Sequence, residues 1–230
     1  MMAPPNERYL FLKERIKDIA LSSHRVPEDI LLITVSKMHS VNELLKVYRA
    51  GCRDFGENRI QEALKKIPQC PKDIHWHLIG SLQSNKVNKA VSSFHLIQSI
   101  DTPHLAKKIS EQSVKFNVTT SILLQVNTSG EPQKHGLDAE GWRRHLEEIE
   151  DYPNIELKGL MTIAPLTEDR YTIQTCFAHL RELKEEFTKE VKNPSFFYHL
   201  SMGMSHDYDL AIQEGATMLR IGSAIFQFKE

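Results

Sequence analysis

The chain has 230 residues, 40% of them hydrophobic and 26% charged, which is typical of a folded globular protein and excludes a disordered or fibrous one. Lysine and arginine number 29 against 30 aspartate and glutamate, so the formal charge of −1 gives no global positive field to attract nucleic acid or an anionic membrane. There is no apolar signal region or membrane-spanning run, and the three dispersed cysteines match neither a disulfide framework nor a zinc site, so we expect a cytoplasmic protein with reduced thiols.

Apolar β-rich runs alternate with helical patterns along the chain. An amphipathic helix is expected first, over residues 6–22. The predicted strands follow it at residues 31–36, 52–55, 74–79, 95–99, 121–127, 156–163, 196–201 and 218–221. The helices predicted between them cover residues 41–50, 58–66, 85–92, 103–116, 139–151, 170–192 and 207–213. Strands joined by helical crossovers are typical of parallel βαβ units. The pattern therefore predicts an α/β protein, a single (β/α)8 TIM barrel domain over residues 1–230 with an extra N-terminal helix.

Local signals support these elements. Ser40 followed by Glu43 predicts a capping box, and Thr102 before Pro103 predicts another helix start. The longest irregular segment, residues 128–136, follows the fifth strand. Such a segment would overhang the barrel mouth as a lid, or would be a disordered surface loop.

Lys37 stands directly after the first apolar strand. Ligands of α/β proteins bind at the carboxyl ends of the strands, and an amine between apolar walls loses its proton more easily and attacks carbonyls. Lys37 is therefore a candidate Schiff-base lysine. The alternative is a solvated surface charge.

Gly222 and Ser223 follow the last strand and begin a short helical pattern over residues 223–226. Backbone N–H groups at such a turn bind phosphate, and barrel enzymes often hold phosphate after strands seven and eight. Ser201, at the end of the seventh strand, adds a hydroxyl. Each glycine alone is more often a simple turn residue, but two such turns at consecutive strand ends favour a phosphate site. A lysine and a phosphate site together predict pyridoxal 5'-phosphate.

Arg220 is the next to last residue of the eighth strand, which would direct it into the barrel or along its rim. A buried arginine needs acceptors, such as a pyridine nitrogen or the carboxylate of Glu57. Asn58 follows the second strand, where it would donate to an oxygen of a cofactor ring or cap the next helix.

His75 and His77 alternate along the third strand and so share one face. Two imidazoles could bind a metal, but no third ligand with suitable spacing accompanies them, and a hydrogen-bonded barrel histidine is the favoured interpretation. We expect no metal and keep His77 among the candidate cofactor-binding residues.

These residues occur in ordered blocks, and with them the chain resembles the pyridoxal phosphate homeostasis protein family, the YggS/PROSC-type proteins. The similarity runs from about residue 30 to residue 226. Its blocks are Val35-Ser36-Lys37, Phe55-Gly56-Glu57-Asn58, Trp76-His77-Leu78-Ile79-Gly80, Leu82-Gln83-Ser84-Asn85-Lys86, Gly159-Leu160-Met161, Leu200-Ser201-Met202-Gly203-Met204-Ser205 and Arg220-Ile221-Gly222-Ser223-Ala224-Ile225-Phe226.

The resemblance implies a fold-type III barrel like the N-terminal domain of alanine racemase. It implies a covalent aldimine of the cofactor with Lys37, a contact of Arg220 with the ring nitrogen, and Asn58 near the ring. It also implies phosphate contacts from Ser201, Gly222 and Ser223.

The resemblance further implies a protein that holds and supplies pyridoxal phosphate in vitamin B6 homeostasis. We expect a monomer, recipient apo-enzymes as partners, and no catalytic residue or robust turnover. A racemase of this fold needs a second base from another domain, which this chain lacks. The alternatives are an amino-acid racemase or related enzyme, and a barrel that binds another phosphorylated metabolite.

Overall fold

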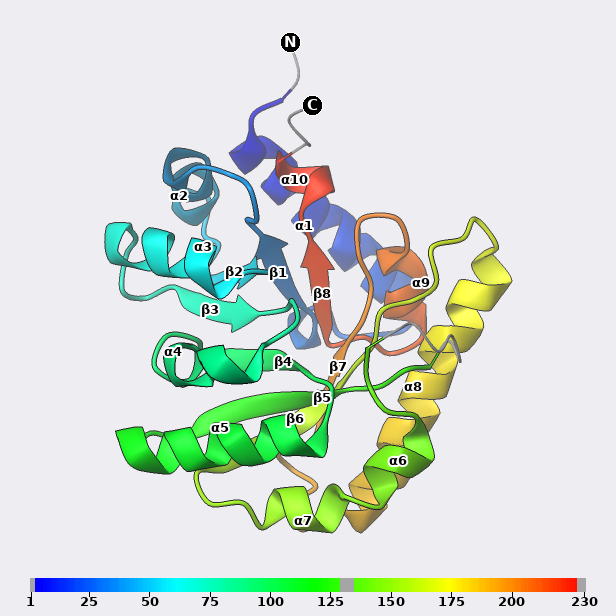
Figure 1. Cartoon of the computed structure of the whole chain (residues 1–230). Helices are drawn as coiled ribbons and strands as arrows, with labels where there is room; N and C mark the ends of the chain where they lie inside the picture. Colours follow the sequence, from blue (N-terminus) through cyan, green and yellow to red (C-terminus); the bar gives the residue numbers. More distant parts are fainter. Residues whose placement is uncertain (1–2, 129–134, 227–230) are drawn as a thin grey trace.

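A computed structural model describes residues 3–128 and 135–226 of the chain. Its strands form one closed parallel barrel in chain order, in which β1 pairs with both β2 and β8 (Figure 1). The strands are β1 (Leu31–Val35), β2 (Asp54–Glu57), β3 (His75–Leu78), β4 (Leu96–Ile100), β5 (Thr120–Gln125), β6 (Ile155–Met161), β7 (His199–Ser201) and β8 (Met218–Ile221). The predicted (β/α)8 barrel is confirmed.

Helices follow the strands around the outside of the barrel. They are α1 (Pro5–Ser22), α2 (Val41–Arg49), α3 (Ile60–Lys66), α4 (Val87–Val91), α5 (Pro103–Phe116), α6 (Ala139–Arg143), α7 (Leu146–Glu150), α8 (Arg170–Glu190), α9 (Tyr208–Gln213) and α10 (Ser223–Phe226), with short 3-10 turns η1 (Pro27–Asp29), η2 (Ile67–Gln69) and η3 (Ser84–Lys86). Ser40 and Glu43 form the predicted capping box of α2, and the Thr102 side chain caps α5. No helix within the described residues is long and apolar enough to cross a membrane.

Several predicted boundaries differ from the structure, and β7, for example, begins at His199 rather than at residue 196. Strand β2 begins at Asp54 and continues to Glu57, beyond its predicted end, because Glu57 is buried and paired with Lys66 rather than turned toward solvent. The helix predicted over 139–151 is two helices, since the His145 amide bonds the Trp142 carbonyl three residues back. The helix predicted over 85–92 is divided into η3 and α4. Most of the segment predicted as a lid, residues 129–134, lies outside the described residues.

The extra N-terminal helix covers the seam where the first and last strands meet. Helix α10 is a single turn and is too short to cover β8 alone. Helix α1 packs against α2, α9 and α10 and passes behind β1 and β8 (Figure 1). The structure thus confirms the predicted extra helix. This helix covers the part of the barrel that a longer helix after β8 would otherwise cover.

Two apolar clusters stabilise the barrel. The larger cluster lies between the outer faces of the strands and the helices, and includes Phe55 and Phe177. The smaller cluster fills the middle of the barrel and consists of Ile33, Leu96, Leu123, Met161 and Met218, with Leu31 packed against it. Other inward positions carry polar side chains, and these positions build the site.

Candidate functional site

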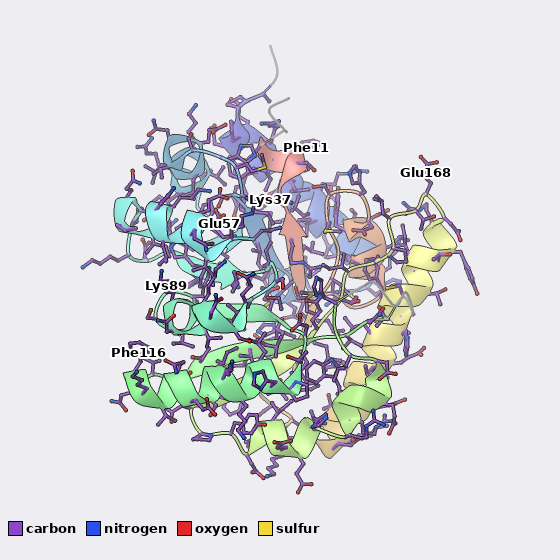
Figure 2. All side chains as sticks on the ribbon, in the orientation of Figure 1. Phe11, Lys37, Glu57, Lys89, Phe116 and Glu168 are labelled. Carbon is purple, nitrogen blue, oxygen red and sulfur yellow. The ribbon has the colours of Figure 1, made fainter. Side chains whose placement is uncertain are left out.

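A hollow of about 230 Å³ opens at the carboxyl ends of the strands, next to β1 and β8. Five residues predicted from the sequence line it, namely Lys37, Asn58, Arg220, Gly222 and Ser223. The other lining residues, which include positions that sequence reasoning missed, are Val35, Ile79, Ile163, Met204, Ser205 and His206. Figure 2 shows Lys37 at this end of the barrel, close to Glu57. The structure therefore brings the amine, the arginine and the glycine turn to one pocket.

Hydrogen bonds of the two neighbouring residues, Ser36 and Met38, fix the backbone at Lys37. The Ser36 hydroxyl donates to Glu57 Oε1 at 2.7 Å, and the Ser36 carbonyl accepts from Lys66 Nζ at 2.7 Å. On the other side, Met38 has a left-handed backbone with φ 64°, and its amide donates to Glu62 Oε1 at 2.5 Å. The Lys37 amine itself makes no ion pair or hydrogen bond with any described residue. The backbone is fixed while the amine is left for a ligand.

The support beneath Lys37 is a buried ion pair. Lys66 Nζ lies 2.7 Å from Glu57 Oε1 and 2.7 Å from Glu62 Oε1. Burial raises the pKa of Glu57, and hydrogen bonds from Lys66 and Ser36 oppose that shift. The second oxygen of Glu57 is buried without a partner in the described structure. This arrangement stiffens the end of β1 but leaves Glu57 dependent on Lys66 for compensation of its charge.

Arg220 lies inside the barrel with 5% of its surface exposed. Its Nη1 donates to Ser201 Oγ at 2.6 Å and its Nη2 donates to the Thr162 carbonyl at 2.7 Å. Burial lowers the pKa of Arg220 to about 10, and the charge of Asp207 partly opposes this. The interpretation that Arg220 pairs with Glu57 is wrong, since Glu57 pairs with Lys66. Because a guanidinium has five N–H groups and no acceptor, Arg220 retains donors for a ligand.

Gly222 and Ser223 form a turn with free backbone donors. Neither amide donates to any described group, whereas the next amide, that of Ala224, donates to Ser205 Oγ at 3.3 Å. A Cβ on Gly222 would lie 3.0 Å from the Val35 carbonyl oxygen. The turn is thus packed tightly on β1, and its N–H groups fit the oxygens of a phosphate ester.

Asn58 reaches the pocket because the backbone after β3 passes close to it. A Cβ on Gly80 would lie 2.3 Å from the Asn58 carbonyl oxygen, so only glycine permits this approach. The Asn58 side chain makes no hydrogen bond within the described structure and does not cap α3. An amide donor is therefore available at the pocket wall.

Ser201 and His77 do not line this pocket and lie deeper in the barrel. Ser201 Oγ contacts Arg220 Nη1 and Gln98 Oε1, each at 2.6 Å. His77 Nε2 lies 3.0 Å from Asp54 Oδ1. In the described part of the chain, no three histidine, cysteine or acidic side chains converge as metal ligands. Gln98 was missed by sequence reasoning, although a glutamine within an apolar strand is a usable signal.

A hollow of about 630 Å³ adjoins the candidate pocket and shares Ile163, Met204 and His206 with it, while two further hollows lie at the other end of the barrel. One of about 530 Å³ lies between α1 and the beginnings of β1 and β2, and a second of about 500 Å³ adjoins it. The charged residues that line the first are of both signs, including Lys13, Lys17, Glu14 and Glu28. In neither of these two hollows do an amine, a buried guanidinium and a glycine turn with free backbone donors come together, so we place the candidate site at the smaller pocket.

Comparison with protein families gives one match over most of the chain. Residues 18–229 match the family described as alanine racemase, N-terminal domain. A protein of Aquifex aeolicus named Pyridoxal phosphate homeostasis protein is 38% identical over 223 residues, which cover 96% of each chain. A Schizosaccharomyces pombe protein of the same name is 39% identical over 201 residues, 86% of this chain and 84% of that one.

Solved structures agree with these matches. PipY of Synechococcus elongatus PCC7942, whose structure is described as having PLP bound, superposes with a TM-score of 0.81 and 36% identity, over 92% of this chain and 99% of that one. An alanine racemase of Clostridium difficile 630 has a TM-score of 0.74 and 15% identity, over 95% of this chain and 55% of that one. At that identity the racemase shares the barrel fold.

Proposed function

The chain belongs to the alanine racemase N-terminal domain family and within it to the pyridoxal phosphate homeostasis proteins, and on this premise we propose that it binds pyridoxal 5'-phosphate and supplies it within the cell. One observation carries the proposal. The unpaired amine of Lys37 shares a pocket with the free amides of Gly222 and Ser223 and with the N–H groups of Arg220. An aldehyde, a phosphate and a pyridine nitrogen are the groups that these three partners would hold.

Each residue has one role in this arrangement. Lys37 condenses with the aldehyde of the cofactor to form an imine, and one water molecule leaves. The amides of Gly222 and Ser223 and the Ser223 hydroxyl donate to the phosphate. Arg220 donates to the ring nitrogen, and the amide of Asn58 donates to the ring oxygen. Bound pyridoxal phosphate supplies a reactive aldehyde and an electron-accepting ring.

We infer storage and transfer of the cofactor rather than turnover. Arg220 can only donate hydrogen bonds, so it leaves the ring nitrogen unprotonated and weakens the ring as an acceptor of electrons. Among the described lining residues, the titratable side chains are Lys37, Arg220 and His206. Racemisation requires a proton acceptor on each face of the substrate. Lys37 serves one face only, His206 is the one other base among these residues, and we assign it no such role.

The partners and location follow the same proposal. The recipients are apo-enzymes that need the cofactor. We propose that the protein acts as a monomer, in which residues of one chain make the cofactor contacts assigned above. We also propose a cytoplasmic location, a reducing compartment in which thiols such as those of Cys52 and Cys70 are kept reduced.

The test is the visible spectrum of the purified protein mixed with pyridoxal phosphate. The expected result is a yellow absorption band that borohydride bleaches. Mass spectrometry should then find the reduced cofactor attached to Lys37. Lys37→Ala should lose the band and keep the fold. Lys89→Ala is the matched control, because Lys89 is exposed on α4 and should leave the band unchanged (Figure 2). A persistent band in Lys37→Ala, with label on another lysine, would contradict the assignment.

Turnover is tested separately by deuterium exchange at the α-carbon of alanine in heavy water. The storage proposal predicts exchange far below an ordinary enzymatic rate of about 1 s⁻¹, while cofactor transfer to an apo-enzyme proceeds. Exchange with inversion at or above that rate would favour the racemase alternative.

A further inference from the structure

A chain of buried hydrogen bonds leads from Arg220 toward the opposite end of the barrel. Arg220 Nη1 donates to Ser201 Oγ at 2.6 Å, and Ser201 Oγ donates to Gln98 Oε1 at 2.6 Å. Gln98 Nε2 lies 3.2 Å from His77 Nδ1. His77 Nε2 lies 3.0 Å from Asp54 Oδ1. These links join five side chains from five different strands.

The chain connects the pocket with residues that do not touch it. Arg220 lines the pocket, whereas Asp54 is the first residue of β2 and lines the hollow at the other end. Ser201 and Gln98 are 0% exposed, and His77 is 1% exposed. Water therefore does not compete with the inner links, and each link is electrostatically stronger than it would be at the surface.

The two ends fix the direction of every bond. A guanidinium can only donate, so the Ser201 oxygen must accept from Arg220 and its hydroxyl proton must go to Gln98 Oε1. The amide of Gln98 then faces His77 with Nε2, which can only donate. His77 Nδ1 accepts that bond, and Nε2 carries the proton that goes to the carboxylate of Asp54. The opposite amide orientation would leave the Ser201 proton without an acceptor.

We propose that Gln98, His77 and Asp54 are positioning residues that hold Arg220 in the orientation in which its remaining N–H groups face the bound ligand. The proposal rests on the proposed function for the identity of that ligand. Among the described residues, the Arg220 side chain donates only to Ser201 and to the Thr162 carbonyl. The Ser201 contact is the adjustable one, because it is a side chain whose own proton needs Gln98.

Breaking the chain should therefore act on the pocket at a distance. Without an acceptor at position 98, the Ser201 hydroxyl turns to another partner and its contact with Arg220 is lost or weakened. Without Asp54, His77 loses the acceptor that fixes its tautomer, and Nδ1 no longer reliably faces Gln98. The effect of Asp54 on the pocket must pass through Gln98.

This dependence gives a double-mutant test. We expect Gln98→Met, which is similar in size, to weaken pyridoxal phosphate binding about tenfold, the loss of one hydrogen bond to a charged group. Asp54→Ala should weaken binding about threefold in the otherwise wild-type protein and have no effect in the Gln98→Met background, since coupled residues are not additive. Equal effects of Asp54→Ala in both backgrounds, or none in either, would overturn the proposal.

Gln98→Leu serves if Gln98→Met does not fold. It can neither accept from Ser201 nor hydrogen-bond His77, so the Asp54→Ala effect should vanish in that background also. Ser113→Ala is the matched control, because it removes a buried 2.7 Å hydrogen bond to Thr120 away from the pocket. It should lower the free energy of unfolding without changing binding, and a change in binding equal to that of Gln98→Met would count against a specific chain.

A readout in the cofactor-free protein separates this proposal from the proposed function. Nitrogen-15 NMR should show His77 protonated at Nε2, and rotation of the Arg220 guanidinium should become faster in Asp54→Ala. If these signals change but the wild-type protein binds no pyridoxal phosphate, the proposed function is wrong and the role of the hydrogen-bond chain is supported. If the Arg220 signal does not change in the Asp54 and Gln98 variants, the role of the hydrogen-bond chain is wrong, whether or not pyridoxal phosphate binds.

Discussion

The two ends of the barrel are both polar, but their polar groups differ in what they contact. At the end with the first residues of the strands, Asp54 accepts from both His75 and His77, the His75 ring stacks on His95 with centroids 4.7 Å apart, and His199 contacts Thr217. At the other end, the Lys37 amine and the Gly222 and Ser223 amides have no partner in the described structure.

The difference teaches that unpaired donors, and not size alone, mark the candidate binding end. Hollows of about 530 and 500 Å³ lie at the end where Asp54 and the histidines are paired, and one of about 630 Å³ adjoins the candidate pocket. The pocket of about 230 Å³ lies where fixed donors remain free. A preformed site keeps its donors in place before the ligand arrives, and buried polar groups are otherwise paired.

The strongest way to break the binding end is to remove Lys66. Lys66→Met would leave the buried carboxylate of Glu57 uncompensated, and we expect a loss of about 3–5 kcal/mol in the free energy of unfolding. Adding Glu57→Gln should restore much of the loss, because the charge is then gone. Urea unfolding followed by circular dichroism measures both variants. A Lys66→Met protein as stable as the wild type would show that Glu57 does not depend on this pair.

The next change is directed at the free donors. Gly222→Val places side-chain atoms against the Val35 carbonyl and shifts the turn, so we expect pyridoxal phosphate affinity to fall by about 1.5–3 kcal/mol, the value of one hydrogen bond to a charged group. Affinity for unphosphorylated pyridoxal should fall much less. Titration of both ligands by absorbance measures the difference, and Ala224→Val, an exposed neighbour, is the control. Equal losses for the two ligands would place the phosphate elsewhere.

The smallest expected effect lies at the paired end. Burial, with the nearby charges of His77, Lys158 and His95, lowers the pKa of His199 to about 4 from 6.5. Between these values the unfolded chain binds a proton that the folded chain does not, so stability should fall as the pH decreases from about 6.5 to 4, by on the order of 1–2 kcal/mol.

His199→Gln should remove part of this pH dependence and leave cofactor binding unchanged, because His199 lies outside both the pocket and the hydrogen-bond chain. Urea unfolding at several pH values, together with a binding titration, checks both statements. If His199→Gln lowered pyridoxal phosphate affinity as much as Gly222→Val, the two ends of the barrel would not differ in their role in binding.

The barrel could be predicted because the hydrophobic periodicity of strands and helices, and the residues that cap helices, depend only on neighbouring residues in the sequence. The capping box at Ser40 and the proline start at Pro103 can be recognised from neighbouring residues, and both occur in the structure. The end of β2 was not predictable, because Gly56 and Glu57 are typical of a turn. Only Lys66, which packs back from α3, makes it favourable to bury Glu57. That contact depends on tertiary structure.

The site was predictable where a residue follows a strand or, like Arg220, stands near the end of one, and was less predictable for residues deeper inside the barrel. Lys37, Gly222 and Ser223 follow strand ends, and the structure brings them to one pocket. Their roles toward the cofactor stay predictions. Ser201 was predicted as a phosphate contact, but the structure places it against Arg220 and Gln98. His77 is hydrogen-bonded to Asp54 and Gln98, as its favoured interpretation predicted, and does not line the pocket. Alternation along a strand shows whether a side chain points into or out of the barrel, but it does not show how deep in the barrel the side chain lies.

The seam between β1 and β8 has a consequence for how the protein is made. Lys37 follows the first strand, whereas Arg220 and Gly222 belong to the last, and α1 and α10 seal the same seam. Contacts so distant along the chain form late in folding, because the entropy of closing the whole loop must be overcome first. A nascent chain thus carries Lys37 long before the Gly222 turn is synthesised, and a ligand that contacts both needs the closed barrel. A ligand that binds only the closed barrel stabilises it against unfolding, and this stabilisation increases with the concentration of the ligand in the cell.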